Sequence, residues 1–181
     1  MSFKKILLGL GGTVILLAAA FVIFCAVAAP AFENPLPSGT VIDKIVIYKE
    51  KRELTAYHGD RELKTYKVAL GFEPKGHKQF EGDGKTPEGI YKVDGKNPHS
   101  KYHKNLGVSY PNAADRAYAK KHGKRPGGDI KIHGLPNGLG FLKGLHLQKS
   151  DWTLGCIAVT NEEIDELYKY TAIGATVEIH P

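Results

Sequence analysis

The first thirty residues differ from the rest of the chain in their pattern of hydrophobic and polar positions. From Ile6 to Ala29 none of 24 consecutive residues is charged, and a helix of that length can cross a bilayer. Lys4 and Lys5 precede this run and no basic cluster directly follows it, which predicts a cytoplasmic N-terminus with the remaining chain outside. The alternative is a cleaved signal peptide, because the sequence AVA at residues 26–28 resembles a cleavage site. Residues 1–30 are therefore expected to form a membrane anchor or a signal segment, and the domain that follows lies outside the cytoplasmic membrane.

After the apolar segment, short β-rich stretches alternate with turn residues. The Pro-rich residues 31–40 predict an extended linker, and one domain is expected over residues 41–181. Between Phe72 and Glu88 the sequence is rich in Gly, Lys and Pro and has no period, which predicts a long exposed loop. We expect short strands at Lys44–Tyr48, Leu54–Tyr57, Leu63–Leu70, Gly89–Val93, within GGDIKIHG at residues 127–134, at Cys156–Val159 and at ATVEI, residues 175–179.

Capping residues mark the ends of two helices. Asn112 precedes a short helical stretch that Gly123 follows. Thr160 and Glu163 form a capping-box pattern, and Gly174 is expected to end this second helix before the last strand. The pattern as a whole predicts a mainly β domain, a compact antiparallel or mixed β-sandwich or barrel-like fold with two or three short helices.

The charge of the chain excludes one class of partner. The sequence contains 25 Lys and Arg against 19 Asp and Glu, and Lys4 and Lys5 supply two of the resulting six net positive charges. The exported part is therefore weakly basic, which suits an anionic polymer or surface. It lacks the Arg-dense stripe typical of phosphate-backbone binding, so no nucleic-acid partner is expected.

The chain has a single cysteine outside the apolar segment, Cys156. In an exported domain this thiol has no disulfide partner, because Cys25 lies within the apolar run. A cysteine in the sequence GCIAV is by itself more often a buried core residue than a nucleophile. Two features favour a reactive thiol: Gly155 lets the backbone approach a ligand closely, and a nearby helix start modestly stabilises a thiolate.

A nucleophilic cysteine also needs a base, and His133 is the candidate. It ends a predicted strand directly before Gly134, which suits a side chain that projects into a cleft. Cysteine and histidine side chains that lie close together can exchange a proton and give a nucleophile at neutral pH. A zinc site of His133, His146 and Cys156 is the alternative, but the sequence shows no helix-borne ligand pair, and no metal is expected.

Two linked motifs resemble those of L,D-transpeptidase catalytic domains of the YkuD type. They are IHG at Ile132–Gly134 and TLGC at Thr153–Cys156. The resemblance covers residues 41–181 and extends to the flanking stretches GDGKTPEGIYKV at Gly82–Val93 and LGVSYPN at Leu106–Asn112.

This resemblance implies an enzyme of the cell envelope that acts on peptidoglycan stem peptides without a cofactor. Cys156 would be the nucleophile that attacks the carbonyl between a third-position diamino acid and a D-amino acid, forming a thioester. His133 would be the general base, the Gly134 carbonyl would orient it, and the Gly155 and Cys156 amides would stabilise the oxyanion. An amine acceptor makes the reaction a transpeptidation and water makes it a hydrolysis. A non-catalytic wall-binding module is the third possibility.

The chain departs from the family pattern at three places. The spacing from His133 to Cys156 is 23 positions (156 − 133), longer than usual, which predicts an inserted loop over the cleft. Leu154 replaces a frequent His, and Ala158 replaces an Arg that is available to a substrate carboxylate in many members. Further candidates for substrate contacts are His146, Trp152, Tyr110 and Lys78, and after them Lys85 and Lys143.

Overall fold

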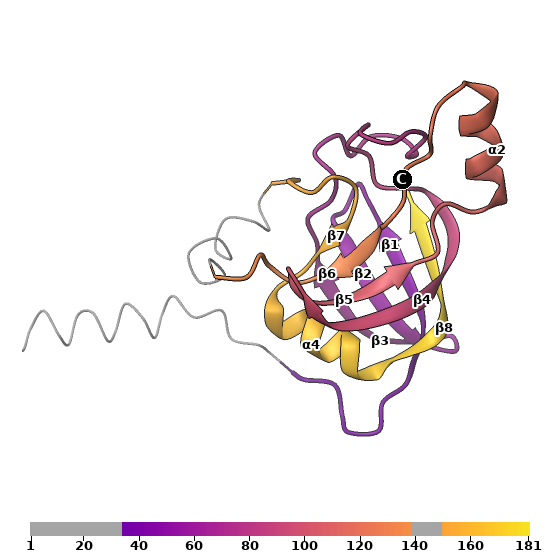
Figure 1. Ribbon diagram of the computed structural model, residues 1–181. Coiled ribbons are helices and arrows are strands. Elements are labelled where there is room, and N and C mark those ends of the chain that lie inside the picture. The colour runs from indigo at the N-terminus through magenta and orange to yellow at the C-terminus, as the bar shows by residue number, and fades with distance from the viewer. Residues whose placement is uncertain (1–33, 139–149) are drawn as a thin grey trace, which may run out of the picture. The chain divides into compact units, whose positions relative to one another are not determined.

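The fold is a mainly β domain built on one curled sheet of eight strands. The computed structural model describes residues 34–138 and 150–181 (Figure 1). The sheet has the strand order β3-β2-β1-β8-β4-β5-β6-β7. Its elements along the chain are β1 Ile42–Tyr48, β2 Glu53–His58, β3 Arg61–Lys67, β4 Gly89–Ser100, β5 His103–Val108, α2 Ala113–Lys121, β6 Lys131–His133, β7 Ile157–Ala158, α4 Asn161–Tyr170 and β8 Thr171–His180.

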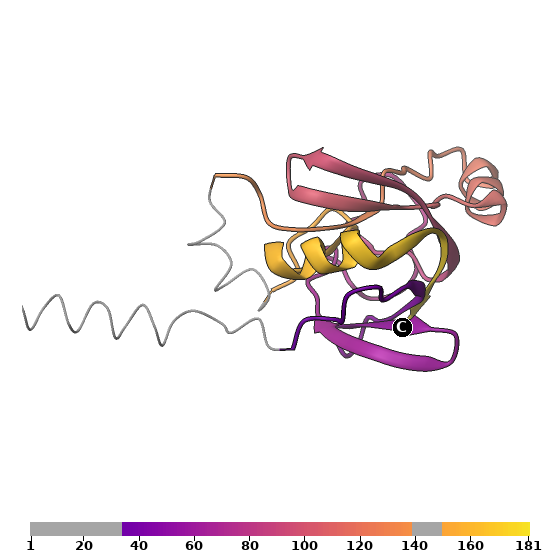
Figure 2. The ribbon, with the colours of Figure 1, turned by 90° about the horizontal axis from the view of Figure 1, so that it is seen from below.

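The sheet is mixed, because two of its strand pairs run parallel. β1 pairs with β8 and β6 pairs with β7 in parallel, whereas the remaining neighbours are antiparallel. Helix α4 lies between the part of the sheet formed by β4 and β5 and the part formed by β1 to β3 (Figure 2). The predicted mainly β fold with short helices is confirmed, and of the two predicted arrangements the single curled sheet matches the barrel-like one.

Inward-facing aliphatic side chains from the sheet and from α4 form the core. Along β1, Ile45 and Ile47 are fully buried, as the two-residue period of a strand requires for side chains on one face. In α4 the buried residues Ile164 and Leu167 are three positions apart, which places them on one side of the helix. Leu36 joins the same core, so residues before β1 already pack against the domain.

Both predicted helix starts are confirmed by their capping geometry. The Asn112 side chain accepts hydrogen bonds at the start of α2, and Thr160 and Glu163 form the capping box of α4. The predicted end of α4 at Gly174 is wrong, because the helix ends at Tyr170 and Thr171 is already extended. Gly174, at a φ of 85°, lies instead where the register between β1 and β8 shifts, a backbone conformation that glycine adopts without strain.

The region between residues 89 and 108 contains more strand than the sequence pattern predicts. The predicted strand Gly89–Val93 is the first part of β4, which continues to Ser100, and β5 pairs with it to form a hairpin. Many residues of this hairpin are polar, so it shows little hydrophobic alternation. The loop predicted between Phe72 and Glu88 is confirmed, since no helix or strand of the sheet falls there. Its predicted exposure is wrong for part of the loop, because Lys78 and Thr86 are buried.

The predicted membrane or signal segment lies outside the described residues. Within residues 34–138 and 150–181, no helix is both long and apolar enough to span a membrane.

Candidate active site

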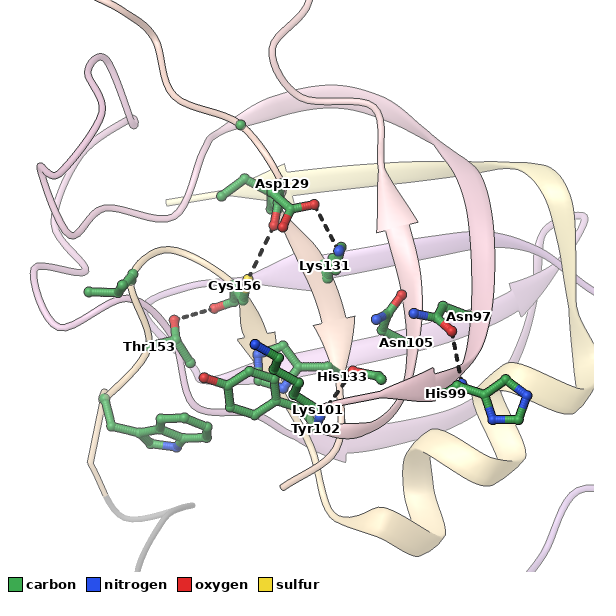
Figure 3. Close-up of a pocket in the computed structure, with 15 residues that line it drawn as sticks. Asn97, His99, Lys101, Tyr102, Asn105, Asp129, Lys131, His133, Thr153 and Cys156 are labelled. Carbon is green, nitrogen blue, oxygen red and sulfur yellow. Dashed lines mark hydrogen bonds and ion pairs between the residues drawn. The ribbon is translucent and has the colours of Figure 1, made fainter. Parts of the chain in front are cut away.

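A cavity of about 650 Å³ opens between β6, the β4–β5 turn and the segment that carries Cys156. Cys156 and His133 both line it (Figure 3). The structure therefore brings together the two residues that the sequence motifs single out.

Strand register explains why these two side chains face the same cavity. In the parallel pair of β6 and β7, Ile132 lies opposite Ile157, and both are fully buried in the core. Because side chains alternate along a strand, the residues beside this pair, namely Lys131, His133 and Cys156, point to the opposite face. The pairing of β6 with β7 thus brings His133 and Cys156 to the same cavity, although they are 23 positions apart in the sequence (156 − 133).

The His133 ring is held in one orientation by a hydrogen bond and by ring packing. Its Nδ1 lies 2.7 Å from the Gly134 carbonyl oxygen. A carbonyl only accepts, so Nδ1 carries the proton and Nε2 has a free lone pair. Tyr102 packs against the ring at a centroid distance of 4.5 Å, and the residue is 3% exposed. Burial lowers the pKa of His133 and the charge of Lys131 lowers it further, although the Gly134 bond opposes the shift. The ring is therefore neutral and able to accept a proton at neutral pH.

The Cys156 thiol is also in its neutral form. Burial raises the pKa of Cys156, and this effect outweighs a hydrogen bond from the Lys131 backbone that favours the thiolate. Within the described residues, Sγ donates to the Asp129 carbonyl oxygen at 3.6 Å rather than to His133 (Figure 3). The S–H must therefore point away from Asp129 and toward His133 before the imidazole can take its proton. Asp129 holds this carbonyl in place with a left-handed backbone, at a φ of 60°.

Thr153 shapes the segment that carries the thiol. Its hydroxyl donates to the Cys156 carbonyl at 2.7 Å and accepts from the Gly155 amide at 3.1 Å. Gly155 has a φ of 128°, and a Cβ there would lie 2.6 Å from the Lys85 carbonyl oxygen, so only glycine fits. The bond to Thr153 occupies the Gly155 amide, which was an expected oxyanion donor, and leaves the Cys156 amide as the candidate for that role. The sequence motif contained Thr153, but only the tertiary contacts show what it does.

Two aromatic side chains form the wall of the cavity next to the imidazole. Trp152, an expected substrate contact, packs edge-on against His133 with ring centroids 5.8 Å apart. Its indole nitrogen is buried, and none of the described residues accepts a hydrogen bond from it. Tyr102, which sequence reasoning missed, packs against both rings, with its centroid 4.5 Å from that of His133 and 6.1 Å from that of Trp152. It follows a polar stretch without a motif, so the sequence held no signal for it.

Other residues expected to contact substrate lie away from the cavity. Lys78 is 3% exposed, and its ammonium group forms an ion pair with Asp83 at 2.7 Å. The Tyr110 hydroxyl donates to the Pro126 carbonyl at 3.0 Å. The Lys85 ammonium donates to the Lys75 carbonyl oxygen at 2.7 Å, also outside the cavity lining. His146 and Lys143 lie outside the described residues.

The two positions that depart from the family pattern differ in exposure. Leu154 is 77% exposed at the edge of the cavity. Ala158 is 2% exposed and exchanges backbone hydrogen bonds with Ala69, and its methyl group offers no cation to a substrate carboxylate. The alternative zinc site needs His146, and in the part of the chain that the structure describes no group of three or more His, Cys, Asp or Glu side chains could hold a metal ion.

Comparisons with known proteins agree with this geometry. A family model of the L,D-transpeptidase catalytic domain (YkuD) matches residues 42–179. The putative L,D-transpeptidase YafK of Escherichia coli is 35% identical over 139 residues, which cover 74% of this chain and 48% of YafK. The crystal structure of the helical cell shape determining protein Pgp2 from Campylobacter jejuni is 28% identical with a TM-score of 0.58, and the match covers 80% of this chain and 49% of that one.

A more distant structure shows that the fold is shared. An L,D-transpeptidase from Xylanimonas cellulosilytica is 15% identical with a TM-score of 0.52, over 81% of this chain and 64% of that one. The chain spans about half the length of YafK and of Pgp2. Since the family model covers almost the whole region after the apolar segment, this chain belongs to the L,D-transpeptidase catalytic domain family.

Proposed function

We propose that this chain is a peptidoglycan L,D-transpeptidase that uses Cys156 as its nucleophile. The observation that carries the proposal is that His133, on β6, and Cys156, directly before β7, line one cavity, with the imidazole oriented by the Gly134 carbonyl. Family membership supports the reaction class, and the proposed site of action is the cell envelope. Anchoring in the cytoplasmic membrane through residues 1–30 is part of the same proposal.

The reaction begins with acylation of the thiol. His133 Nε2 takes the Sγ proton, and the thiolate attacks the carbonyl between the diamino acid and the D-amino acid of a stem peptide. The Cys156 amide stabilises the oxyanion. The imidazolium then returns its proton to the leaving amine, so the peptide bond breaks, the D-amino acid departs and a thioester remains.

Deacylation repeats these proton transfers with a new nucleophile. The side-chain amine of a second stem peptide loses a proton to His133, attacks the thioester and forms the cross-link, and Cys156 recovers its proton. Water in place of the amine gives a trimmed stem peptide instead. A neutral imidazole is needed at the start of both steps, which the lowered pKa of His133 favours.

Purified tetrapeptide muropeptides test the proposal. Incubation with the protein should give dimers joined through the diamino acids, measured by mass spectrometry, and Cys156→Ala should give none, because its side chain cannot form a thioester. His133→Ala should lower the rate by at least about a hundred-fold, the usual contribution of a general base. Monomers shortened by one residue would identify a carboxypeptidase, and unchanged muropeptides would contradict both activities.

A further inference from the structure

The wall of the cavity beside the thiol carries more positive than negative charge. Lys101, at the turn between β4 and β5, and Lys131, on β6, both line the cavity. Asp129 is the one acidic side chain among the described residues that line it. A cavity with this balance attracts an anionic group of a ligand.

Both lysines are available to a ligand. None of the ion pairs in the described part of the chain involves Lys101, and this residue is exposed. Lys131 pairs with Asp129 at 2.8 Å, but the Asp129 carboxylate is 85% exposed, so this pair contributes little and can exchange for a substrate anion.

A buried amide lies beside the two lysines. Asn105 is 4% exposed, lines the cavity and lies opposite His133 in the pairing of β5 and β6 (Figure 3). None of the hydrogen bonds among the described residues involves its side-chain amide. The amide therefore faces the cavity, where it can donate a hydrogen bond to an oxygen of a ligand.

The sheet also explains why the positive charge beside Cys156 comes from Lys131 on β6 and not from β7. Ala158, directly after Ile157 on β7, is a buried alanine and supplies no positive charge. Lys131 lies one position before Ile132, which pairs with Ile157, so it is next to Cys156 across the strands and on the same face.

We propose that Lys101, Lys131 and Asn105 form a carboxylate-binding subsite, which makes the enzyme prefer donor stem peptides with a free carboxylate next to the scissile bond. The inference rests on the proposed function and adds the chemistry of the substrate. Two carboxylates of a donor meet the description: the side-chain carboxylate of a diamino acid such as diaminopimelate, and the terminal carboxylate of the D-amino acid. A carboxamide at the same place keeps the shape but loses the charge.

Kinetics on three matched donors test this subsite. The donors are a tetrapeptide muropeptide with both carboxylates free, one amidated on the diamino acid and one amidated at the C-terminus. The protein should show a kcat/KM about ten-fold higher for the free form than for one of the amidated forms, as a charge-assisted hydrogen bond at a partly exposed site implies. The amidated form that loses activity identifies which carboxylate is bound.

Variants connect the preference to the named residues. Lys101→Gln and Lys131→Gln should each reduce the preference for the free donor several-fold, and Asn105→Asp should reduce it further because two carboxylates then repel. The preference is the ratio of kcat/KM for the free donor to kcat/KM for the amidated donor, both measured with the same variant. If a substitution also changes the pKa of His133, it changes both rates equally, and the ratio stays the same. Lys120→Gln removes the same charge from the exposed face of α2 and should leave the preference as it is.

The outcomes separate the subsite from the reaction. The subsite would be overturned if the unaltered protein turned over all three donors equally. It would also be overturned if the preference persisted in the three cavity variants. Both outcomes leave the transpeptidase proposal standing. Turnover of none of the donors would overturn the proposed function, and the subsite with it.

Discussion

At the residue scale, the thiol and the imidazole rest as a neutral pair. Burial raises the pKa of Cys156 above its ordinary value of about 9 and lowers the pKa of His133 below its ordinary value of about 6.5. Both shifts have the same cause, since burial disfavours the charged form of each group. A preformed thiolate–imidazolium pair is therefore not the resting state, and in the proposed mechanism the transfer of the Cys156 proton to His133 accompanies the attack on the substrate.

Alkylation of Cys156 by iodoacetamide should show this in its pH dependence. Only the thiolate reacts, so a raised pKa predicts a rate that increases about ten-fold per pH unit from about pH 6 to pH 9 without a plateau at the acidic end. Mass spectrometry of the labelled peptide gives the rate, and Cys156→Ala gives the background from Cys25.

Two other results of this experiment are informative. A fast plateau near pH 6 would refute the neutral pair and indicate a preformed ion pair. Labelling that requires denaturant would support a buried, inert cysteine and hence the non-catalytic wall-binding module.

At the scale of single elements, the loop between residues 72 and 88 supports the segment that carries the thiol. The Phe72 amide donates to the Thr153 carbonyl oxygen at 3.0 Å. Within the loop, Asp83 accepts from the Lys78 ammonium at 2.7 Å and from the amides of three loop residues, Gln79, Phe80 and Lys85. Burial alone would raise the pKa of Asp83, but these bonds together lower it. A buried cation, rather than a substrate contact, is thus the role that the structure gives to Lys78.

Asp83→Asn should lower the free energy of unfolding by about 2–3 kcal/mol at pH 7, because it leaves the Lys78 ammonium buried without a counter-charge. Urea denaturation measures the loss. A lowered carboxylate pKa stabilises the fold fully above the unfolded-state value of about 3.8, and this contribution disappears as the pH falls through the lowered value. The difference in the free energy of unfolding between Asp83→Asn and the unaltered protein should therefore become smaller in strong acid.

Glu81→Gln is the matched control in the same loop. Glu81 pairs with Arg125 at 2.8 Å, but the Arg125 side chain is 84% exposed, so the loss should stay below about 1 kcal/mol. Equal losses in the two variants would disprove a special role of the buried pair.

At the scale of the whole domain, one carboxylate joins segments that lie far apart in the sequence. Glu166 of α4 is 7% exposed and accepts from the Leu36 amide at 2.5 Å, from the Tyr66 hydroxyl at 2.8 Å and from the Lys64 ammonium at 2.8 Å. It thereby connects the residues before β1 and strand β3 to α4. Because α4 also contacts β5 and β6, this cluster links the chain's first described residues to the strands beside the cavity.

Glu166→Gln should destabilise the domain by about 2 kcal/mol, since an amide cannot accept from all three donors at once. Thermal unfolding should show the loss as a lower Tm. Glu162→Gln, an exposed position on the same helix, should cost less than about 1 kcal/mol. A Glu166→Gln protein as stable as the control would refute the linking role.

Local signals in the sequence predicted the features that depend on neighbouring residues. The capping side chains of Asn112 and Thr160 act within three or four positions, so their patterns were sufficient. The Cys156 and His133 motifs likewise indicated the chemistry. The β4–β5 hairpin was not predicted beyond Val93, because its polar residues are held in strands by pairing rather than by their own preference.

By itself, the sequence determined a mainly β domain, its two capped helices and the two residues expected to react. Only the tertiary structure decided which polar groups are already in use, because hydrogen bonds between distant segments leave no local pattern. It shows the Gly155 amide bonded to Thr153 and the Lys78 ammonium bonded to Asp83, and it leaves the Asn105 amide facing the cavity. Burial, which sets the pKa shifts of Cys156 and His133, is likewise a property of the packed domain and not of either motif.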